Sequence, residues 1–256
     1  MNSWIGLVQK EWTQMKWRFV FFVLISNLML FWGVPHLVFG VPEGTFTSIE
    51  PMIAICFILH LIMAVSLLFD CLGTDIKRPD IWLHSPFPMR QLVGAKFLLV
   101  LLTVGFSLVL GGMIAGITYL MGNGVVSIWD NLFLLLGAGV VILLNAIYVM
   151  AIVFFFWSIY QVFRSRVGWL SILIIILLVN IWLYGWGVVW FTEVFQTVKE
   201  MGPMHGSIQA IDFLMLHNYV VPGGTILTVG SLVLYGMLTV FYFVSGAMLF
   251  EKKVRL

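Results

Sequence analysis

Three aspartates at five-residue spacing are the strongest candidates for chemistry in this sequence. Asp70, Asp75 and Asp80 follow a long apolar run. Clustered carboxylates in such a place can hold magnesium with a pyrophosphate or a nucleotide, as membrane-embedded lipid or prenyl transferases require. Residues five apart are, however, about 140° apart around a helix and do not share a face. We therefore expect solvated loop acids that balance Lys77 and Arg78, with the transferase as an alternative.

The motifs of the common hydrolases are absent from the sequence. A phosphate-binding loop needs Gly-Lys before Ser or Thr, and no Gly-Lys dipeptide occurs. The zinc-protease pattern His-Glu-x-x-His and the hydrolase pattern Gly-x-Ser-x-Gly are also missing. We therefore expect no enzymatic activity, no catalytic or metal-binding residue and no cofactor in this chain. Any ATP-driven role would need ATP and magnesium bound by a separate subunit.

Few polar side chains interrupt the long apolar runs, and none of them carries a fixed charge. Ion- or proton-driven carriers use acids and bases within the membrane as relays, so this class of transporter fits poorly. The polar groups are expected to form hydrogen bonds between helices. They are Asn27, His36, His60, Asn145 and Asn180. Cys56 and Cys71 would lie about 22 Å apart along one helix, which is too far for a disulfide.

The elements that must position these residues are membrane-spanning helices. The chain has 256 residues, of which 62% are hydrophobic and 9% are charged, whereas soluble domains carry roughly 25% charged residues. A helix needs about 20 apolar residues to cross a hydrocarbon core. We therefore predict an all-α polytopic membrane protein that forms a single transmembrane domain over residues 1–256. Its six predicted spans, all without charged residues, are 19–39, 52–69, 97–121, 132–160, 167–191 and 225–250.

The basic residues predict how the spans are oriented. All but one of the 13 Lys and Arg residues lie before the first span, in the second–third loop, in the fourth–fifth loop or after the last span. Only Lys199 lies on the other side. The positive-inside rule then predicts that both termini are cytoplasmic. The net charge of +2 does not indicate a nucleic-acid partner, and we expect the basic residues to contact lipid headgroups.

Three segments outside the spans have patterns of their own. Residues 1–18 place Trp and Met side chains at helical spacing, which predicts an interfacial helix or, equally well, an anchor for the first span. Residues 70–96 form the second–third loop, whose prolines predict a short helix or turn at the cytoplasmic membrane surface. Residues 192–224 predict one or two short outer helices before the last span.

This combination resembles the permease subunits of type 2 ABC transporters, in particular those of bacterial exporters. The topology is similar over nearly the whole chain. Residues 85–96, Ser-Pro-Phe-Pro-Met-Arg-Gln-Leu-Val-Gly-Ala-Lys, also resemble the loop of that family, which carries a proline, an arginine, a leucine and a lysine at the next span. The matching residues are Pro88, Arg90, Leu92 and Lys96.

The resemblance implies a subunit that depends on a separate ATPase. Two permease copies, identical or paralogous, would form the pathway, and two copies of a cytosolic ABC ATPase would dock on the second–third loop and the N-terminal helix. ATP-driven closure of the ATPase pair would then drive alternating access. The coupling-loop residues that would dock the ATPase are Trp82, Leu83, Phe87, Pro88 and Arg90, and those of the N-terminal helix are Lys10, Glu11 and Trp12.

The expected cargo is hydrophobic or amphipathic, because the spans are lined by aromatic and aliphatic side chains. A peptide, an antibiotic or a lipid-linked molecule fits this description, although the sequence identifies no substrate-binding residue. The resemblance adds a bacterial cell membrane as the location and antibiotic resistance or immunity as the role. A non-transporting membrane scaffold or sensor, which needs only helices and a docking loop, is an alternative of another class.

Overall fold

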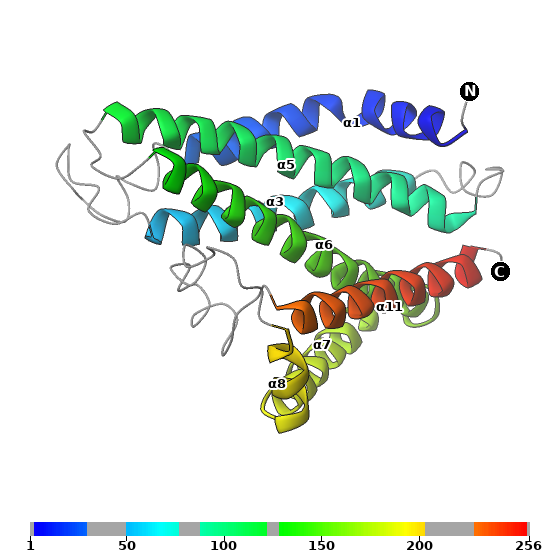
Figure 1. Cartoon of the computed structure of the whole chain (residues 1–256). Coiled ribbons are helices and arrows are strands. Elements are labelled where there is room, and N and C mark those ends of the chain that lie inside the picture. The colour runs from blue at the N-terminus through cyan, green and yellow to red at the C-terminus, as the bar shows by residue number, and fades with distance from the viewer. Residues whose placement is uncertain (1–2, 30–49, 77–87, 122–127, 203–227, 255–256) are drawn as a thin grey trace. The chain divides into compact units, whose positions relative to one another are not determined.

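The computed structural model describes residues 3–29, 50–76, 88–121, 128–202 and 228–254. These residues form helices joined by short connections, so the predicted all-α class is confirmed. The helices are α1 (Ser3–Leu28), α3 (Glu50–Ile76), α5 (Met89–Met121), α6 (Ile128–Val167), α7 (Leu170–Trp190), α8 (Glu193–Glu200) and α11 (Val229–Val254) (Figure 1).

Among the described residues, five helices are long and apolar enough to cross a membrane. These candidate spans correspond to the second through sixth predicted spans, so the transmembrane character of the chain is confirmed. The first predicted span, residues 19–39, extends beyond the described residues, and the total of six spans stays a prediction. The candidate spans are Cys56–Thr74, Met89–Met113, Leu136–Val167, Leu170–Trp190 and Val229–Lys252.

Gly168 separates α6 from α7 at a point where the sequence predicted a different boundary. Its φ of 60° is positive, a conformation that glycine adopts without a steric penalty and that commonly ends helices. The amide of Gly168 donates to the carbonyl of Arg164 at 3.2 Å. Basic side chains in the last turn of α6, Arg164 and Arg166, interact favourably with the helix dipole. The fourth span therefore continues past residue 160, and α7 begins only at Leu170.

The helices belong to two compact units, with α3, α5 and α6 contributing to both. Among the described residues, unit 1 contains 3–29, 50–71, 95–121 and 128–146. Unit 2 contains 72–76, 88–94, 147–202 and 228–254.

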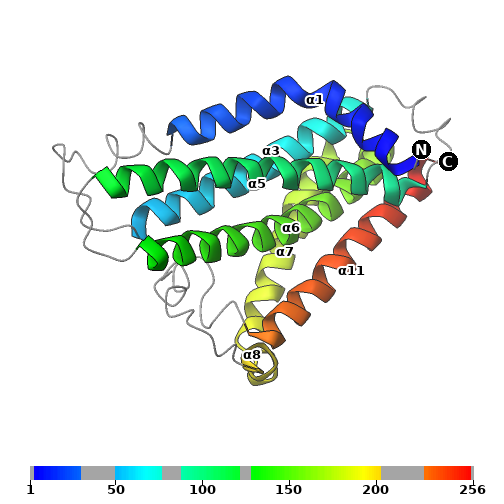
Figure 2. The same cartoon turned by 45° about the horizontal axis from the view of Figure 1, so that its top comes forward.

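In unit 1, α1, α3 and α5 lie side by side (Figure 2). The helix α1 runs through Arg18 without interruption, so residues of the predicted interfacial segment and of the first span belong to one helix. One stripe of α1 is buried at every fourth position, as expected for a helix packed along one face. Its members are Leu7, Glu11, Met15, Phe19 and Val23.

In unit 2, α11 packs closely against α6 at Gly246. A Cβ atom at this position would lie 2.9 Å from Cδ1 of Phe154 and 3.2 Å from Cα of Phe155. The rings of Phe154 and Phe243 are 5.9 Å apart at the same contact. The missing side chain of Gly246 therefore allows the two helices to approach each other.

The short helix α8 lies within the segment where short helices were predicted, and it packs against α7 and α11. Phe195 contacts the rings of Trp186 and Trp190, at centroid distances of 5.5 and 5.2 Å. The ammonium of Lys199 lies 4.4 Å from the centre of the Trp190 ring, a cation–π contact that is stronger when desolvated, and Lys199 is almost fully buried. These contacts fix α8 through its aromatic and basic side chains.

Thr228 caps the start of α11 and joins it to α8. Its amide donates to Oγ of Ser231 at 3.1 Å, and the Ser231 amide donates to Oγ1 of Thr228 at 3.0 Å. This reciprocal pair is a capping box with serine in place of the usual acid or amide. The Thr228 hydroxyl also donates to the carbonyl of Lys199. The same threonine thus satisfies backbone groups of both helices.

Candidate functional site

The first half of the predicted docking surface lies at the start of α5, in unit 2. Pro88 is exposed, and its carbonyl accepts hydrogen bonds from the amides of Gln91 at 2.9 Å and Leu92 at 3.4 Å. Proline is well suited to a helix start because its missing N–H would have no partner there. Arg90 is exposed, whereas Leu92 is buried. The remaining predicted docking residues of this loop lie outside the described residues and are Trp82, Leu83 and Phe87.

The second half of the predicted surface lies on α1, in unit 1. Lys10 and Trp12 are exposed, and the Trp12 ring stacks on Phe19 at 5.7 Å. Glu11 is different, because only 4% of its surface is exposed. Its Oε2 atom lies 2.5 Å from Nζ of Lys96 on α5. Glu11, which was predicted to dock the ATPase, is therefore buried and already paired with Lys96.

The Glu11–Lys96 pair is a buried link between two helices of unit 1. Lys96 is 1% exposed. Taking a lone charge out of water costs several kcal/mol, so each partner needs the other's charge. Lys96 directly precedes the third predicted span, and Glu11 belongs to the predicted N-terminal interfacial segment. The pair therefore holds the N-terminal part of α1 against the beginning of that span.

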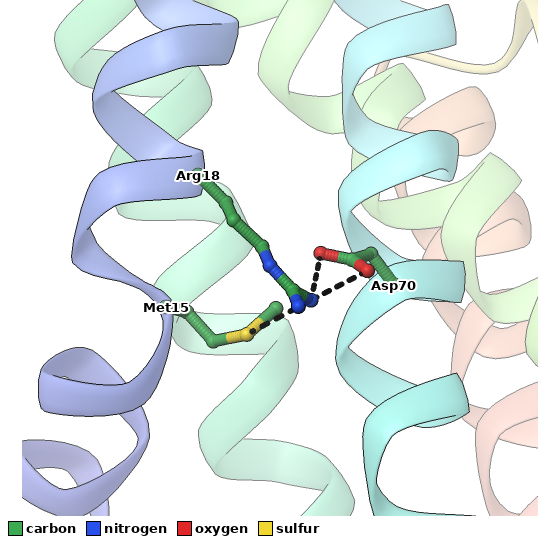
Figure 3. A network of polar contacts seen from close by, with 3 residues as sticks. All are labelled: Met15, Arg18 and Asp70. Atoms are coloured by element: carbon green, nitrogen blue, oxygen red, sulfur yellow. Dashed lines mark hydrogen bonds and ion pairs between the residues drawn. The ribbon is translucent and has the colours of Figure 1, made fainter.

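A second ion pair joins α1 to α3 in the same unit. Nη1 of Arg18 lies 2.6 Å from both carboxylate oxygens of Asp70. Figure 3 shows the two side chains pointing toward each other, with the sulfur of Met15 beside the guanidinium at 3.8 Å. Arg18 directly precedes the first predicted span and Asp70 directly follows the second. The ion pair therefore holds the start of the first span and the end of the second span at the same depth.

The aspartate pattern considered for magnesium gains no support from the described residues. Asp70 contributes its carboxylate to the pair with Arg18, and Asp80 lies outside the description. In the part of the chain that the structure describes, no three His, Cys, Asp or Glu side chains are grouped to hold a metal ion.

A buried polar network connects three apolar helices of unit 1, with Ser107 of α5 at its centre. Its Oγ atom lies 3.0 Å from Oγ of Ser26 and 2.9 Å from Nδ2 of Asn27, both on α1. It also lies 3.1 Å from Nε2 of His60 on α3. The predicted interhelical role of Asn27 and His60 is therefore confirmed.

The backbone contact of His60 fixes the position of one ring proton. Nδ1 of His60 lies 2.8 Å from the carbonyl of Cys56, which only accepts, so this nitrogen carries the proton. In a neutral imidazole Nε2 is then an acceptor, and the Ser107 hydroxyl donates to it. Ser107 in turn accepts from Nδ2 of Asn27, and the hydroxyl of Ser26, which contacts Ser107, also donates to the carbonyl of Val23 at 3.1 Å.

One atom of the network makes no hydrogen bond with any described residue. Nδ2 of Asn27 donates to the carbonyl of Val23 at 2.9 Å as well as to Ser107, which orients the amide and leaves Oδ1 unpaired. Gly111 of α5 faces this oxygen, and a Cβ there would lie 3.1 Å from it. Glycine at this position thus makes room for the asparagine.

Two other predicted interhelical groups bond within their own helices instead. Asn145 donates to the carbonyl of Val141 at 2.9 Å, and Asn180 donates to that of Ile176 at 2.7 Å. For these two residues the predicted bond between helices is absent among the described residues. His36 lies outside the description.

Sequence reasoning did not identify Ser107 as the centre of the network. A serine in an apolar run has no distinctive spacing, and its hydroxyl can also bond to its own helix. The only available signal was the presence of other polar residues at similar depth in neighbouring spans. Cys56 and Cys71 are both free cysteines, as predicted.

No protein-family model, curated protein or solved structure matches this chain. The resemblance to transporter permeases therefore rests on the predicted topology and on the pattern of residues 85–96.

Proposed function

We propose that this chain is the membrane-spanning permease subunit of an ATP-driven transporter and that it exports a hydrophobic or amphipathic molecule. The observation that carries the proposal is the buried pair between Glu11 and Lys96. It joins the two segments that a docked ATPase would contact, the N-terminal helix and the end of the second–third loop. A force applied to either segment would therefore act on both.

The helix α5 would carry this force into the membrane. It is continuous from Met89 to Met121, with the exposed Arg90 in its first turn and the buried Lys96 two turns later. Further along, Ser107 binds side chains of α1 and α3. Rigid helices coupled by specific contacts are suited to transmit a switch between two arrangements. In this mechanism α1, α3 and the unit 1 part of α5 move together.

The cargo and the partners follow from what the helices expose. Only Ser171 and Trp190 of α7 are buried, which leaves an apolar surface for lipid or for a second permease copy, identical or paralogous. The predicted spans hold no charged residue, which favours a hydrophobic or amphipathic cargo over an ion. ATP and magnesium would be bound by two copies of a cytosolic ABC ATPase.

Purification from native membranes tests the proposal. The tagged chain would be isolated in mild detergent, and the proteins that accompany it identified by mass spectrometry. We expect an ABC ATPase in stoichiometric amount with the parent chain and its loss with Phe87→Asp and Arg90→Glu. The matched control is Arg166→Glu, which reverses another exposed basic residue and should retain the ATPase. The scaffold alternative predicts no nucleotide-binding partner in any of these preparations.

A further inference from the structure

Beside the ion pair of Arg18 and Asp70 lies a shallow depression that the proposed transport cycle does not use. Its volume is 460 Å³, and it is open to the surroundings. The helix α1 contributes most of the lining and α3 contributes one side chain. The lining residues are Trp17, Arg18, Phe21, Phe22 and Asp70.

The guanidinium of Arg18 has donors left for a ligand. Its hydrogen bonds with described residues all use Nη1, which contacts Asp70 and Met15. The N–H groups of Nε and Nη2 form the other edge of the planar group, the edge that binds a phosphate through two parallel hydrogen bonds. The side chain of Arg18 is 46% exposed. Within the described part of the chain, this edge is available to a phosphate.

The surroundings of Arg18 combine positive charge with apolar surface. Lys16 lies with its ammonium 5.9 Å from the Trp17 ring, so two cations and one carboxylate lie near the depression. Trp17 is 76% exposed and Phe21 59%. Tryptophan is enriched at the headgroup level of membranes, and Phe21 lies one helical turn further into the predicted first span. The side chains that can bind a lipid headgroup thus lie next to an apolar surface that suits an acyl chain.

We propose that this depression binds an anionic glycerophospholipid. The lipid phosphate would accept two hydrogen bonds from Nε and Nη2 of Arg18, while Asp70 holds the guanidinium in place from the opposite edge. An acyl chain would lie along Phe21 and Phe22. The excess of positive charge favours a lipid with a net negative charge over a zwitterionic one. The proposal requires a membrane-embedded chain but does not depend on the transport function.

Native mass spectrometry of the purified full-length chain tests this site. The delipidated protein would be titrated with phosphatidylglycerol, and the fraction carrying lipid would be measured. We expect Arg18→Gln to raise the apparent Kd at least about tenfold, the effect of losing one charge-assisted hydrogen bond. Asp70→Asn breaks the same ion pair but keeps the cation, and it should bind phosphatidylglycerol as well as the parent or better. Arg166→Gln is a control outside the depression and should bind like the parent.

Three results would overturn the proposal. The first is equal binding by the parent and Arg18→Gln. The second is an equal loss in Arg18→Gln and Asp70→Asn, which would mean that the ion pair only maintains the fold. The third is displacement of the lipid by millimolar inorganic phosphate, or equal affinity for phosphatidylcholine, because the site would then not recognise an anionic lipid.

Discussion

Nζ of Lys96 on α5 lies 2.5 Å from Oε2 of Glu11 on α1, and both side chains are buried. This contact joins residues far apart in the sequence and holds the N-terminal helix against the third predicted span. We expect the stability of unit 1 to depend strongly on this ion pair.

Breaking this pair on one side should destabilise the protein severely. Glu11→Leu and Lys96→Met each remove one charge and leave the opposite charge buried, which costs about 3–5 kcal/mol. The double variant Glu11→Leu with Lys96→Met removes both charges and should recover much of that loss. Thermal unfolding of the purified chain in mild detergent measures all three. Strictly additive losses in the double variant would show that the two charges do not interact.

Removing the Ser107 hydroxyl should also destabilise unit 1. Ser107→Ala leaves Nε2 of His60 without its partner and removes the interhelical hydrogen bond of Asn27, at a cost of about 1–3 kcal/mol. Ser158→Ala is the matched control, because Ser158 is equally buried but, among the described residues, donates only to the carbonyl of Phe154 in its own helix. We expect its effect to be below about 0.5 kcal/mol, since that carbonyl keeps its helical bond. Equal unfolding temperatures for the two variants would contradict a central role for Ser107.

The close contact at Gly246 predicts that substitution by alanine has opposite effects on stability at two glycines of α11. Gly246→Ala places a methyl group against Phe154 and should cost about 1–3 kcal/mol through overpacking. Gly236→Ala meets nothing within 4 Å and should be neutral or stabilise the helix by up to about 1 kcal/mol. Thermal unfolding of both variants compares them directly. A harmless Gly246→Ala would mean that α6 and α11 are not as close as described.

Loss of the Thr228 cap should loosen α11 locally. Thr228→Ala removes the side chain that accepts from Ser231 and donates to Lys199, a loss of about 1 kcal/mol for an N-cap. Hydrogen–deuterium exchange should become faster in the first turn of α11 and at the end of α8. Thr239→Ala should leave both segments unchanged, because within the described part of the chain this hydroxyl donates only to the carbonyl of Tyr235 in α11. Faster exchange spread evenly over α11 would argue against a capping role.

The sequence predicted the helices of the second through sixth spans, because long apolar runs without charge have few alternatives to a membrane helix. Their edges were less predictable. Arg164 and Arg166 suggested that the fourth span had already ended, yet α6 continues to Val167 because basic residues are favourable at a helix C-terminus. Gly168 provides the actual break, through a positive φ that no hydrophobicity pattern encodes.

The partners of the polar residues could not be read from the sequence. Glu11 and Lys96 come from different helices. Considered by itself, Glu11 has the pattern of a solvent-facing residue on an amphipathic segment. Asn27 and Asn145 are both amides in apolar runs, but only Asn27 has a serine of another helix opposite it. Which neighbour a side chain meets depends on how the helices pack, and helical periodicity does not contain that information.

Crosslinking at Arg90 in intact cells is the most direct test for a docked ATPase. A photoreactive amino acid would replace Arg90 or, as a control, Val194 of α8, which is 75% exposed and lies in the predicted outer segment. We expect the photoreactive residue at position 90 to capture an ATPase with a phosphate-binding loop and the one at position 194 to capture none. Capture of such an ATPase at neither position, in cells where both variants are inserted in the membrane, would contradict the transporter account.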